Sequence, residues 1–519
     1  MQFTIAVCGD LRRPSPSRRA GPSLSPLAGR GVGCGAVRAN SPAKLSSSVM
    51  RRPFLRIPAG SAIVGEVRAT VAVAGPLAAA NLAQMAMGFT NTVVVGSLGS
   101  AALAAAGLGA SLYFTIAMVC SGVLTAVAPL AAHAIGAGDN RRGGRVAGAG
   151  LVLAALLAVP VVAALLVVRR VLVMLGYEPA LAAEIGRYLG AIAWAAPGFL
   201  GFAVLRSFLV AASHSRTVMI ALLLCVPMNA WLNWIVVFGH LGAPALGIAG
   251  SGCSTAVIQW LMFTGLGFYA LTAPSLARYR MRPTSRGWDE IGRILRLGLP
   301  IGGILGLEIG VFATTGILMG LLGADALGAH QLVMNCISVI FMVPLGLAQA
   351  ATVRVAVALG SGMPEAAHRA GVVALVLGVA YMAIMTVVLV TAPRTIARIY
   401  VDTDAPANRG LVGIALYLLV IAAVFQIFDG MQAIAAGALR GYRDTTVPLL
   451  LAVIGYWGVG FAGGWLLAFP GGYGPIGLWS SLAVGLAAVA LMLTVRLHFC
   501  AGTAIAPDRA RPFAAKALL

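Results

Sequence analysis

Three long stretches of this 519-residue chain carry no charged side chain, and this feature constrains the fold more than any other. Asp, Glu, Lys and Arg are absent from residues 69–138, 217–277 and 445–495. Each stretch is long enough for two membrane-spanning helices of about 20 residues with a turn between them. Because only 10% of all residues are charged and the mean hydropathy is +0.94, we predict an all-α polytopic membrane protein.

Twelve membrane spans are predicted from the lengths of the apolar segments. They cover residues 69–96, 105–133, 146–168, 188–212, 217–239, 246–272, 292–320, 328–356, 371–393, 410–437, 446–469 and 475–499. Arginines gather after even-numbered spans, such as Arg141, Arg142 and Arg145 after the second, and Arg440 and Arg443 after the tenth. The turns after the first, fifth, seventh and eleventh spans carry no Arg or Lys. By the positive-inside rule, both termini are expected to be cytoplasmic.

The two halves of the chain repeat each other. With a shift of 224 residues, Pro76 aligns with Pro300 and Gly136 with Gly360. Six spans therefore occur twice in one orientation, which predicts two pseudo-symmetric six-helix bundles and favours alternating-access transport over a pore. The expected order is a disordered basic tail at 1–58, a first bundle at 59–277, a cytoplasmic linker at 278–291, a second bundle at 292–500 and a cytoplasmic tail at 501–519.

The formal net charge of +21 does not indicate a nucleic-acid partner, because the arginines lie in short loops and tails. The first 58 residues are rich in Arg, Ser, Pro and Gly, a composition typical of disorder or of an organelle transit peptide. Met50 is an alternative start, so residues 1–49 are expected to be dispensable. The seven cysteines form no CxxC pair, and no metal or disulfide framework is predicted.

Two acidic residues, Glu308 and Asp429, fall well inside predicted spans, where a carboxylate is costly unless it has a use. Helical spacing places Glu308 and Thr315 on one face, seven residues apart. Glycines recur every four residues on the opposite face, at 298, 302, 306 and 310, and would let another helix approach closely. A buried acid can exchange a proton or bind a cation, so both are candidates to couple Na⁺ or H⁺ to transport.

Other polar residues inside the spans are weaker candidates for a cation or substrate site. They are Gln331, Asn335, Gln426, Gln432, Thr315, Gln84, Asn91 and Asn233. Hydrogen bonding between helices explains such amides and hydroxyls equally well. Arg206 lies inside the fourth span, and its sequence position leaves both snorkelling and ligand contact open.

Several segments resemble the multidrug and toxic compound extrusion (MATE) family, in its NorM-like branch. The closest matches are QIFDGMQAIAAGALRGYRDTTVP, Gln426–Pro448, and PMNAWLNWIVVFG, Pro227–Gly239, and the resemblance covers residues 70–500. In the family, acids matching Glu308 and Asp429 bind the coupling cation, Na⁺ or H⁺. The resemblance implies a monomer in the bacterial inner membrane that exports cationic aromatic compounds without ATP or another cofactor. Many relatives carry an aspartate at the position of Asn91. Because an asparagine side chain cannot titrate, coupling is expected in the second bundle alone.

Two rival functions remain open at this point. A lipid-linked precursor flippase of the same superfamily would need a strongly basic site for an anionic headgroup, whereas the charges deep in these spans are acids. An integral membrane enzyme would need a catalytic constellation in the spans, and the sequence contains no HExxH or GxSxG motif. An ion-coupled antiporter is therefore the leading hypothesis.

Overall fold

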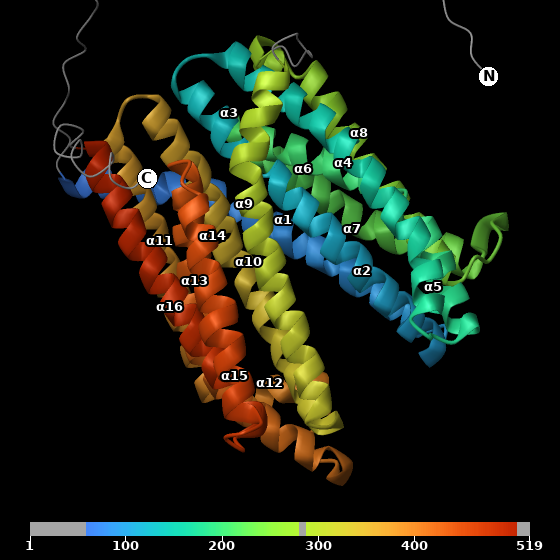
Figure 1. Cartoon of the computed structure of the whole chain (residues 1–519). Coiled ribbons are helices and arrows are strands. Elements are labelled where there is room, and N and C mark those ends of the chain that lie inside the picture. Colours follow the sequence, from blue (N-terminus) through green and yellow to red (C-terminus); the bar gives the residue numbers. More distant parts are fainter. Residues whose placement is uncertain (1–58, 280–286, 506–519) are drawn as a thin grey trace, which may run out of the picture. The chain divides into compact units, whose positions relative to one another are not determined.

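The computed structural model describes residues 59–279 and 287–505, and almost all of them lie in helices (Figure 1). The first half comprises α1 (Ala59–Gly96), α2 (Ser100–Leu124), α3 (Val127–Gly136), α4 (Asn140–Met174), α5 (Pro179–Ile192), α6 (Ala195–Ala211), α7 (Ser215–Phe238), η1 (His240–Gly242), α8 (Ile248–Thr272) and η2 (Pro274–Tyr279). The second half comprises α9 (Gly287–Leu321), α10 (Ala324–Gly360), α11 (Pro364–Thr391), α12 (Pro393–Tyr400), η3 (Pro406–Asn408), α13 (Arg409–Gly441), α14 (Thr446–Ala452), η4 (Val453–Phe461), α15 (Ala462–Ala468) and α16 (Gly474–Ile505). Here η4 is a π-helix, and η1, η2 and η3 are 3₁₀ helices.

Eleven helical segments among the described residues are long and apolar enough to cross a membrane. The helices α5 and α6 make a twelfth span when they are counted together, with a bend of 43° between them. The segment of α2 and α3 counts as one span, as does that of α14, η4 and α15. The predicted all-α fold with twelve spans is therefore confirmed when the bent pair is one span.

Several helices extend past the apolar segments that predict them. α1 already begins at Ala59, α9 begins at Gly287, and α16 continues to Ile505. A helix satisfies its own backbone hydrogen bonds, so it need not stop where the apolar segment ends. The sequence did not predict α12, a short helix that starts with proline at its first position. The expected N-terminal tail, residues 280–286 of the linker and residues 506–519 lie outside the described residues.

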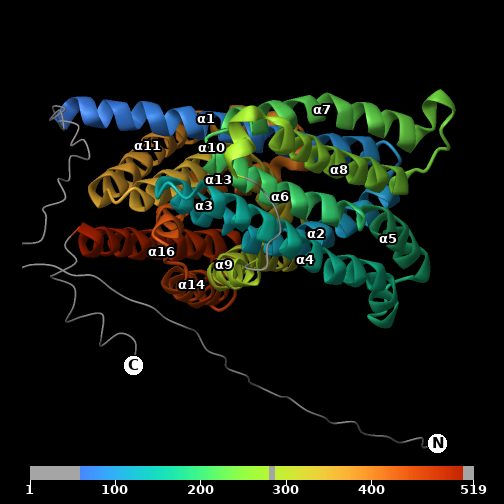
Figure 2. The ribbon, with the colours of Figure 1, turned by 90° about the horizontal axis from the view of Figure 1, so that it is seen from above.

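Each half of the chain packs around its own apolar core. In the first bundle, α6 lies against α8, α4 and α3, and most of its side chains are buried (Figure 2). In the second bundle, α13 takes the corresponding place against α10, α11 and α16 (Figure 2). A helix that is apolar on all sides belongs in such a central position. Arg206 on α6 and Asp429 on α13 are therefore held among other helices.

Glycines bring the two bundles together at backbone distance. A Cβ atom added at Gly346 of α10 would lie 2.8 Å from the Ala78 nitrogen of α1. The same contact recurs with the 224-residue shift, because a Cβ at Gly122 of α2 would lie 2.9 Å from the Gly302 Cα of α9. A Cβ at Gly298 would also collide with the Val123 carbonyl oxygen of α2. The glycine row at 298 and 302 therefore receives a neighbouring helix, as predicted, and that helix belongs to the other bundle.

A second symmetric contact joins the ends of α3 and α10. A Cβ at Gly136 would collide with the Val357 carbonyl oxygen, and one at Gly360 would collide with the His133 carbonyl oxygen. Both pairs obey the 224-residue shift. The helices α3 and α10 end on the side of the molecule on which α1 and α9 begin. We name this side the arginine-rich side, because Arg142, Arg293 and Arg354 lie on it.

Candidate functional site

The two predicted acids lie in the second bundle, Asp429 on the central helix α13 and Glu308 on α9. Asp429 is buried, and its Oδ1 accepts a hydrogen bond from Gln432 Nε2 at 3.3 Å. The Gln432 Oε1 in turn accepts one from the Tyr456 hydroxyl at 2.8 Å. Glu308 is partly exposed, and its carboxyl group interacts electrostatically with that of Asp429. Gln432 thus bonds directly to Asp429, Glu308 lies within electrostatic range of it, and the role of these groups in ion coupling stays a prediction.

An arginine also belongs to this cluster. The apolar pattern predicts that Arg440 follows the tenth span, but α13 continues to Gly441 and includes it. Its Nε is buried and makes no hydrogen bond in the part of the chain that the structure describes. The guanidinium interacts electrostatically with Glu308, so a fixed positive charge faces the acids. A prediction based on apolar segments alone could not show that the helix continues this far.

The π-helix η4 supplies the aromatic side of the site. Its wider turn is typical of functional positions and places Tyr456 next to Gln432. Trp457 donates from Nε1 to the Leu307 carbonyl at 3.2 Å, directly beside Glu308 in the sequence. This hydrogen bond joins η4 to α9. Tyr456 was missed, because no local pattern marks a π-helix.

The other candidates of the second bundle do not contact the two acids through a hydrogen bond in the described residues. Gln426 is buried and faces α11, where its Nε2 lies 3.5 Å from Thr386 Oγ1. Thr315 donates to the Val311 carbonyl of its own helix at 2.7 Å. Asn335 donates to the Gln331 carbonyl at 2.9 Å, and both of these side chains are exposed on α10. Their role as cation or substrate ligands stays a prediction.

An amide cluster forms in the first bundle around Asn91 of α1. Its Oδ1 accepts hydrogen bonds from the Nδ2 atoms of Asn229 and Asn233 of α7, both at 2.9 Å. Its Nδ2 donates to Thr255 Oγ1 of α8 at 3.1 Å. Three helices are thus joined by neutral groups. Each of these hydrogen bonds links helices of the first bundle, and a cation- or substrate-binding role of Asn91 and Asn233 stays a prediction.

Gln84, the last predicted candidate, lies elsewhere, against Arg206. Arg206 Nη1 donates to Gln84 Oε1 at 3.3 Å, and Nη2 donates to Gln349 Oε1 of α10 at 3.0 Å. Arg206 therefore does not snorkel toward the membrane surface. Its side chain turns toward the other bundle.

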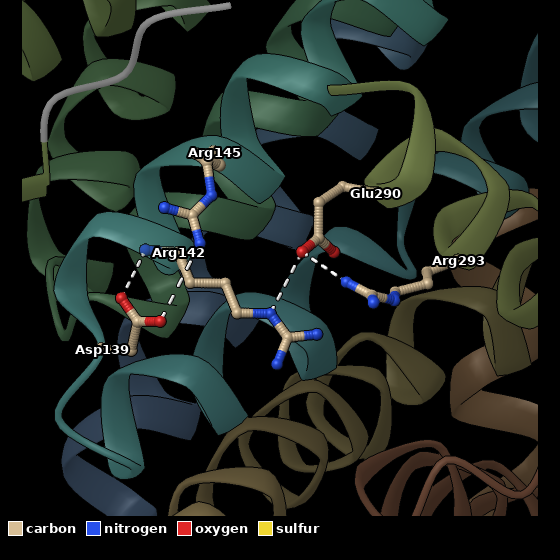
Figure 3. A network of polar contacts seen from close by, with 5 residues as sticks. All are labelled: Asp139, Arg142, Arg145, Glu290 and Arg293. Atoms are coloured by element: carbon tan, nitrogen blue, oxygen red, sulfur yellow. Dashed lines mark hydrogen bonds and ion pairs between the residues drawn. The ribbon is translucent and has the colours of Figure 1, made fainter. Parts of the chain in front are cut away.

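Two ion pairs join the bundles on the arginine-rich side. Glu290 of α9 accepts from Arg142 Nε of α4 at 3.1 Å and from Arg293 Nη1 of its own helix at 2.7 Å (Figure 3). Glu66 of α1 accepts from Arg354 Nε and Nη2 of α10 at 2.5 and 2.7 Å. Glu66 and Glu290 are related by the 224-residue shift, so each bundle contributes the same acid to a cross-bundle pair.

Further charges surround the Glu290 pair. Asp139 caps α4 by accepting from the Arg142 backbone N–H at 2.8 Å, and its carboxylate also lies 3.9 Å from Arg145 (Figure 3). Burial lowers the pKa of Arg443, which lies between α13 and α14, and the nearby Arg142 lowers it further. Positive charge is therefore crowded here, and Glu290 offsets part of it.

Two repeated helical bundles, with carboxylates and amides buried among apolar spans, define a membrane transporter of the alternating-access class. The family model described as MatE matches residues 76–235 and 300–466, and these two matches start at the repeated prolines. The chain belongs to the MATE family and is a transporter, not an enzyme.

Curated relatives and solved structures agree with this assignment. The probable multidrug resistance protein NorM of Mesorhizobium japonicum is 44% identical over 438 residues, covering 83% of this chain and 93% of the relative. The multidrug resistance protein NorM of Burkholderia vietnamiensis is 44% identical over 441 residues, covering 85% and 95%. The crystal structure of the eukaryotic MATE transporter AtDTX14 matches with a TM-score of 0.76 at 22% identity, covering 85% of this chain and 99% of that one. The structural likeness shows the shared fold.

Proposed function

We propose that this protein exports amphipathic, cationic drugs across a bacterial inner membrane in exchange for Na⁺ or H⁺. The observation that carries the proposal is the pair of acids, Glu308 and Asp429, which lie on two helices of one apolar bundle and interact electrostatically. Carboxylates inside a membrane bundle mark ion or substrate pathways. The relatives are named multidrug resistance proteins, which supports drugs as the exported compounds.

The acids supply the coupling chemistry in this proposal. When both are ionised they hold Na⁺, and otherwise one of them takes up a proton while the other stays charged. Gln432 and Tyr456 orient the Asp429 carboxylate, and Arg440 holds a counter-charge near Glu308. A cationic drug and the coupling ion compete for this negative field, so the entry of one favours the release of the other. Coupling then needs no titratable residue at Asn91.

The cross-bundle contacts indicate which face of the transporter is closed. The glycine contacts and both ion pairs lie between helix segments that end or begin on the arginine-rich side. The positive-inside rule makes this side, and with it both termini, cytoplasmic. We infer that the structure is the state sealed toward the cytoplasm. Transport then requires these contacts to separate when the bundles rock about the repeat axis.

A flippase for anionic lipid-linked precursors is not favoured. The described residues place two carboxylates and one arginine in the polar cluster of the second bundle, which does not make a strongly basic site. The relatives with 44% identity carry multidrug resistance names. Small organic cations in the lipid bilayer are therefore the expected partners, and a monomer holds both bundles that the cycle needs.

Purified protein in liposomes tests this function. An imposed Na⁺ or proton gradient should drive uptake of a cationic dye such as ethidium without ATP, and the ion that works identifies the coupling. A matched control is Glu365→Gln, which neutralises an exposed acid at the start of α11 and should leave uptake unchanged. Liposomes that move no dye under either gradient would refute the proposed function.

A further inference from the structure

Arg206 is a charged side chain on the central helix of the first bundle, five residues before α6 ends. Its guanidinium donates to three amide oxygens. Two belong to α1, Asn81 Oδ1 at 2.5 Å and Gln84 Oε1 at 3.3 Å. The third, Gln349 Oε1 at 3.0 Å, belongs to α10 of the second bundle. The arginine therefore lies at a junction of three helices that includes both bundles.

These partners leave the positive charge of Arg206 without a counter-charge. Amide oxygens accept hydrogen bonds but carry no net charge. No acidic side chain in residues 59–279 or 287–505 forms an ion pair with Arg206, whereas the comparable Arg440 interacts with Glu308. An uncompensated charge among membrane helices is costly, and such residues face a pathway or a partner.

Three residues of this cluster are not fully buried. Arg206, Gln84 and Gln349 are all partly exposed, so the cluster is not closed by packing. Three of the five N–H donors of an arginine are used by the amides, and two remain. A carboxylate that approaches would replace neutral acceptors with a charged one, and arginine binds carboxylates more strongly than amides.

We propose that Arg206 is an anion-recognising subsite that takes the carboxylate of zwitterionic aromatic substrates. The inference rests on the proposed transport function only in calling the ligand a substrate. It assigns to Arg206 a recognition role that the acids Glu308 and Asp429 cannot fill, because like-charged carboxylates repel each other. A ligand here would contact α1, α6 and α10, so its access to Arg206 would change when Gln349 moves with the second bundle.

A pair of dyes that differ only in the carboxylate tests the subsite. Rhodamine 110 carries a free carboxylate, and rhodamine 123 is its methyl ester with the same cationic ring system. Binding of each dye to the full-length protein in lipid nanodiscs is measured by fluorescence anisotropy, with empty nanodiscs as the blank. Wild type should bind rhodamine 110 at least as tightly as the ester.

The variant Arg206→Gln keeps hydrogen bonding but removes the charge. It should raise the Kd for rhodamine 110 by about 10- to 100-fold and change that for rhodamine 123 by less than about twofold. Arg206→Lys, which keeps the charge and loses the planar fork, should fall between wild type and Arg206→Gln, and it serves alone if Arg206→Gln does not accumulate. If Arg206→Gln weakens the binding of both dyes equally, or leaves the ratio of their Kd values unchanged, Arg206 is structural and the proposal is overturned.

A transport measurement keeps this result separate from the proposed function. If wild-type liposomes move rhodamine 123 but the ratio of the Kd values for the two dyes does not depend on Arg206, the proposed subsite is refuted. The proposed antiporter function is then unaffected. If liposomes move neither dye, the transport proposal fails, while the binding ratio still decides whether Arg206 recognises the carboxylate.

Discussion

Neutralising Glu66 should loosen the seal between the bundles. Glu66 of α1 receives two hydrogen bonds from Arg354 of α10, and only 9% of its side chain is exposed, against 30% for the arginine. A hydrogen bond to a charged group contributes about 1.5–3 kcal/mol, and partial exposure of the arginine reduces this. Glu66→Gln should therefore cost the sealed state about 1–2 kcal/mol, which is about a 5- to 30-fold shift in the equilibrium between sealed and open states.

The shift can be read from the accessibility of a buried thiol. Ala78 is 8% exposed and faces Gly346 of the other bundle, so a cysteine there reacts only when the bundles part. In a background without the native cysteines, Ala78→Cys is labelled from the cytoplasmic side of inside-out vesicles with a membrane-impermeant reagent. The labelling rate should rise by about 5- to 30-fold with Glu66→Gln, because it follows the population of the open state.

Two controls make this prediction specific. Glu184→Gln removes a surface pair with Arg187 on the same helix and should not change the rate. Exchanging the charges, with Glu66→Arg and Arg354→Glu together, should restore slow labelling. An unchanged rate in Glu66→Gln, or a double variant that labels as fast as the single one, would refute the argument that this pair holds the bundles together.

Three further predictions follow from other parts of the structure. Reporter fusions after Arg145 should report a cytoplasmic location, and fusions in the 239–244 turn should report an external one. The reverse pattern would invert the assignment of the sealed side. Gly360→Val should abolish the tight approach to the His133 carbonyl and speed labelling of the same thiol, whereas slow labelling would show that this contact can adjust. Asn91→Ala removes hydrogen bonds but no titratable group, so gradient-driven export should fall by less than about tenfold, and complete loss would place coupling chemistry in the first bundle.

The parts of the fold that rest on local patterns could be predicted from the sequence. Uncharged apolar segments mark the spans because a membrane helix must be apolar over its whole length. The spacing of Gly298 and Gly302 predicted close packing because a helix repeats every 3.6 residues. The burial of Asp429 could be predicted because the residue lies inside an apolar segment.

The remaining contacts depend on residues far apart in the chain. Arg206 and Gln349 are separated by 143 residues, and Glu66 and Arg354 by 288, so no local spacing relates them. The shared repeat position of Glu66 and Glu290 is the one available signal, since acids that recur in both halves suggest a symmetric role. The continuation of α13 to Arg440 follows from helix hydrogen bonding that hydropathy does not report.

The most direct test of ion coupling is gradient-driven dye uptake by liposomes that contain Glu308→Gln or Asp429→Asn. Both changes keep the size and hydrogen-bonding capacity of the side chain and remove its titratable charge. The account predicts that each variant reconstitutes at normal abundance, with Glu365→Gln as the control, and loses uptake against a gradient. If both variants accumulate dye at the wild-type rate, the carboxylates are structural and coupling does not reside in the second bundle.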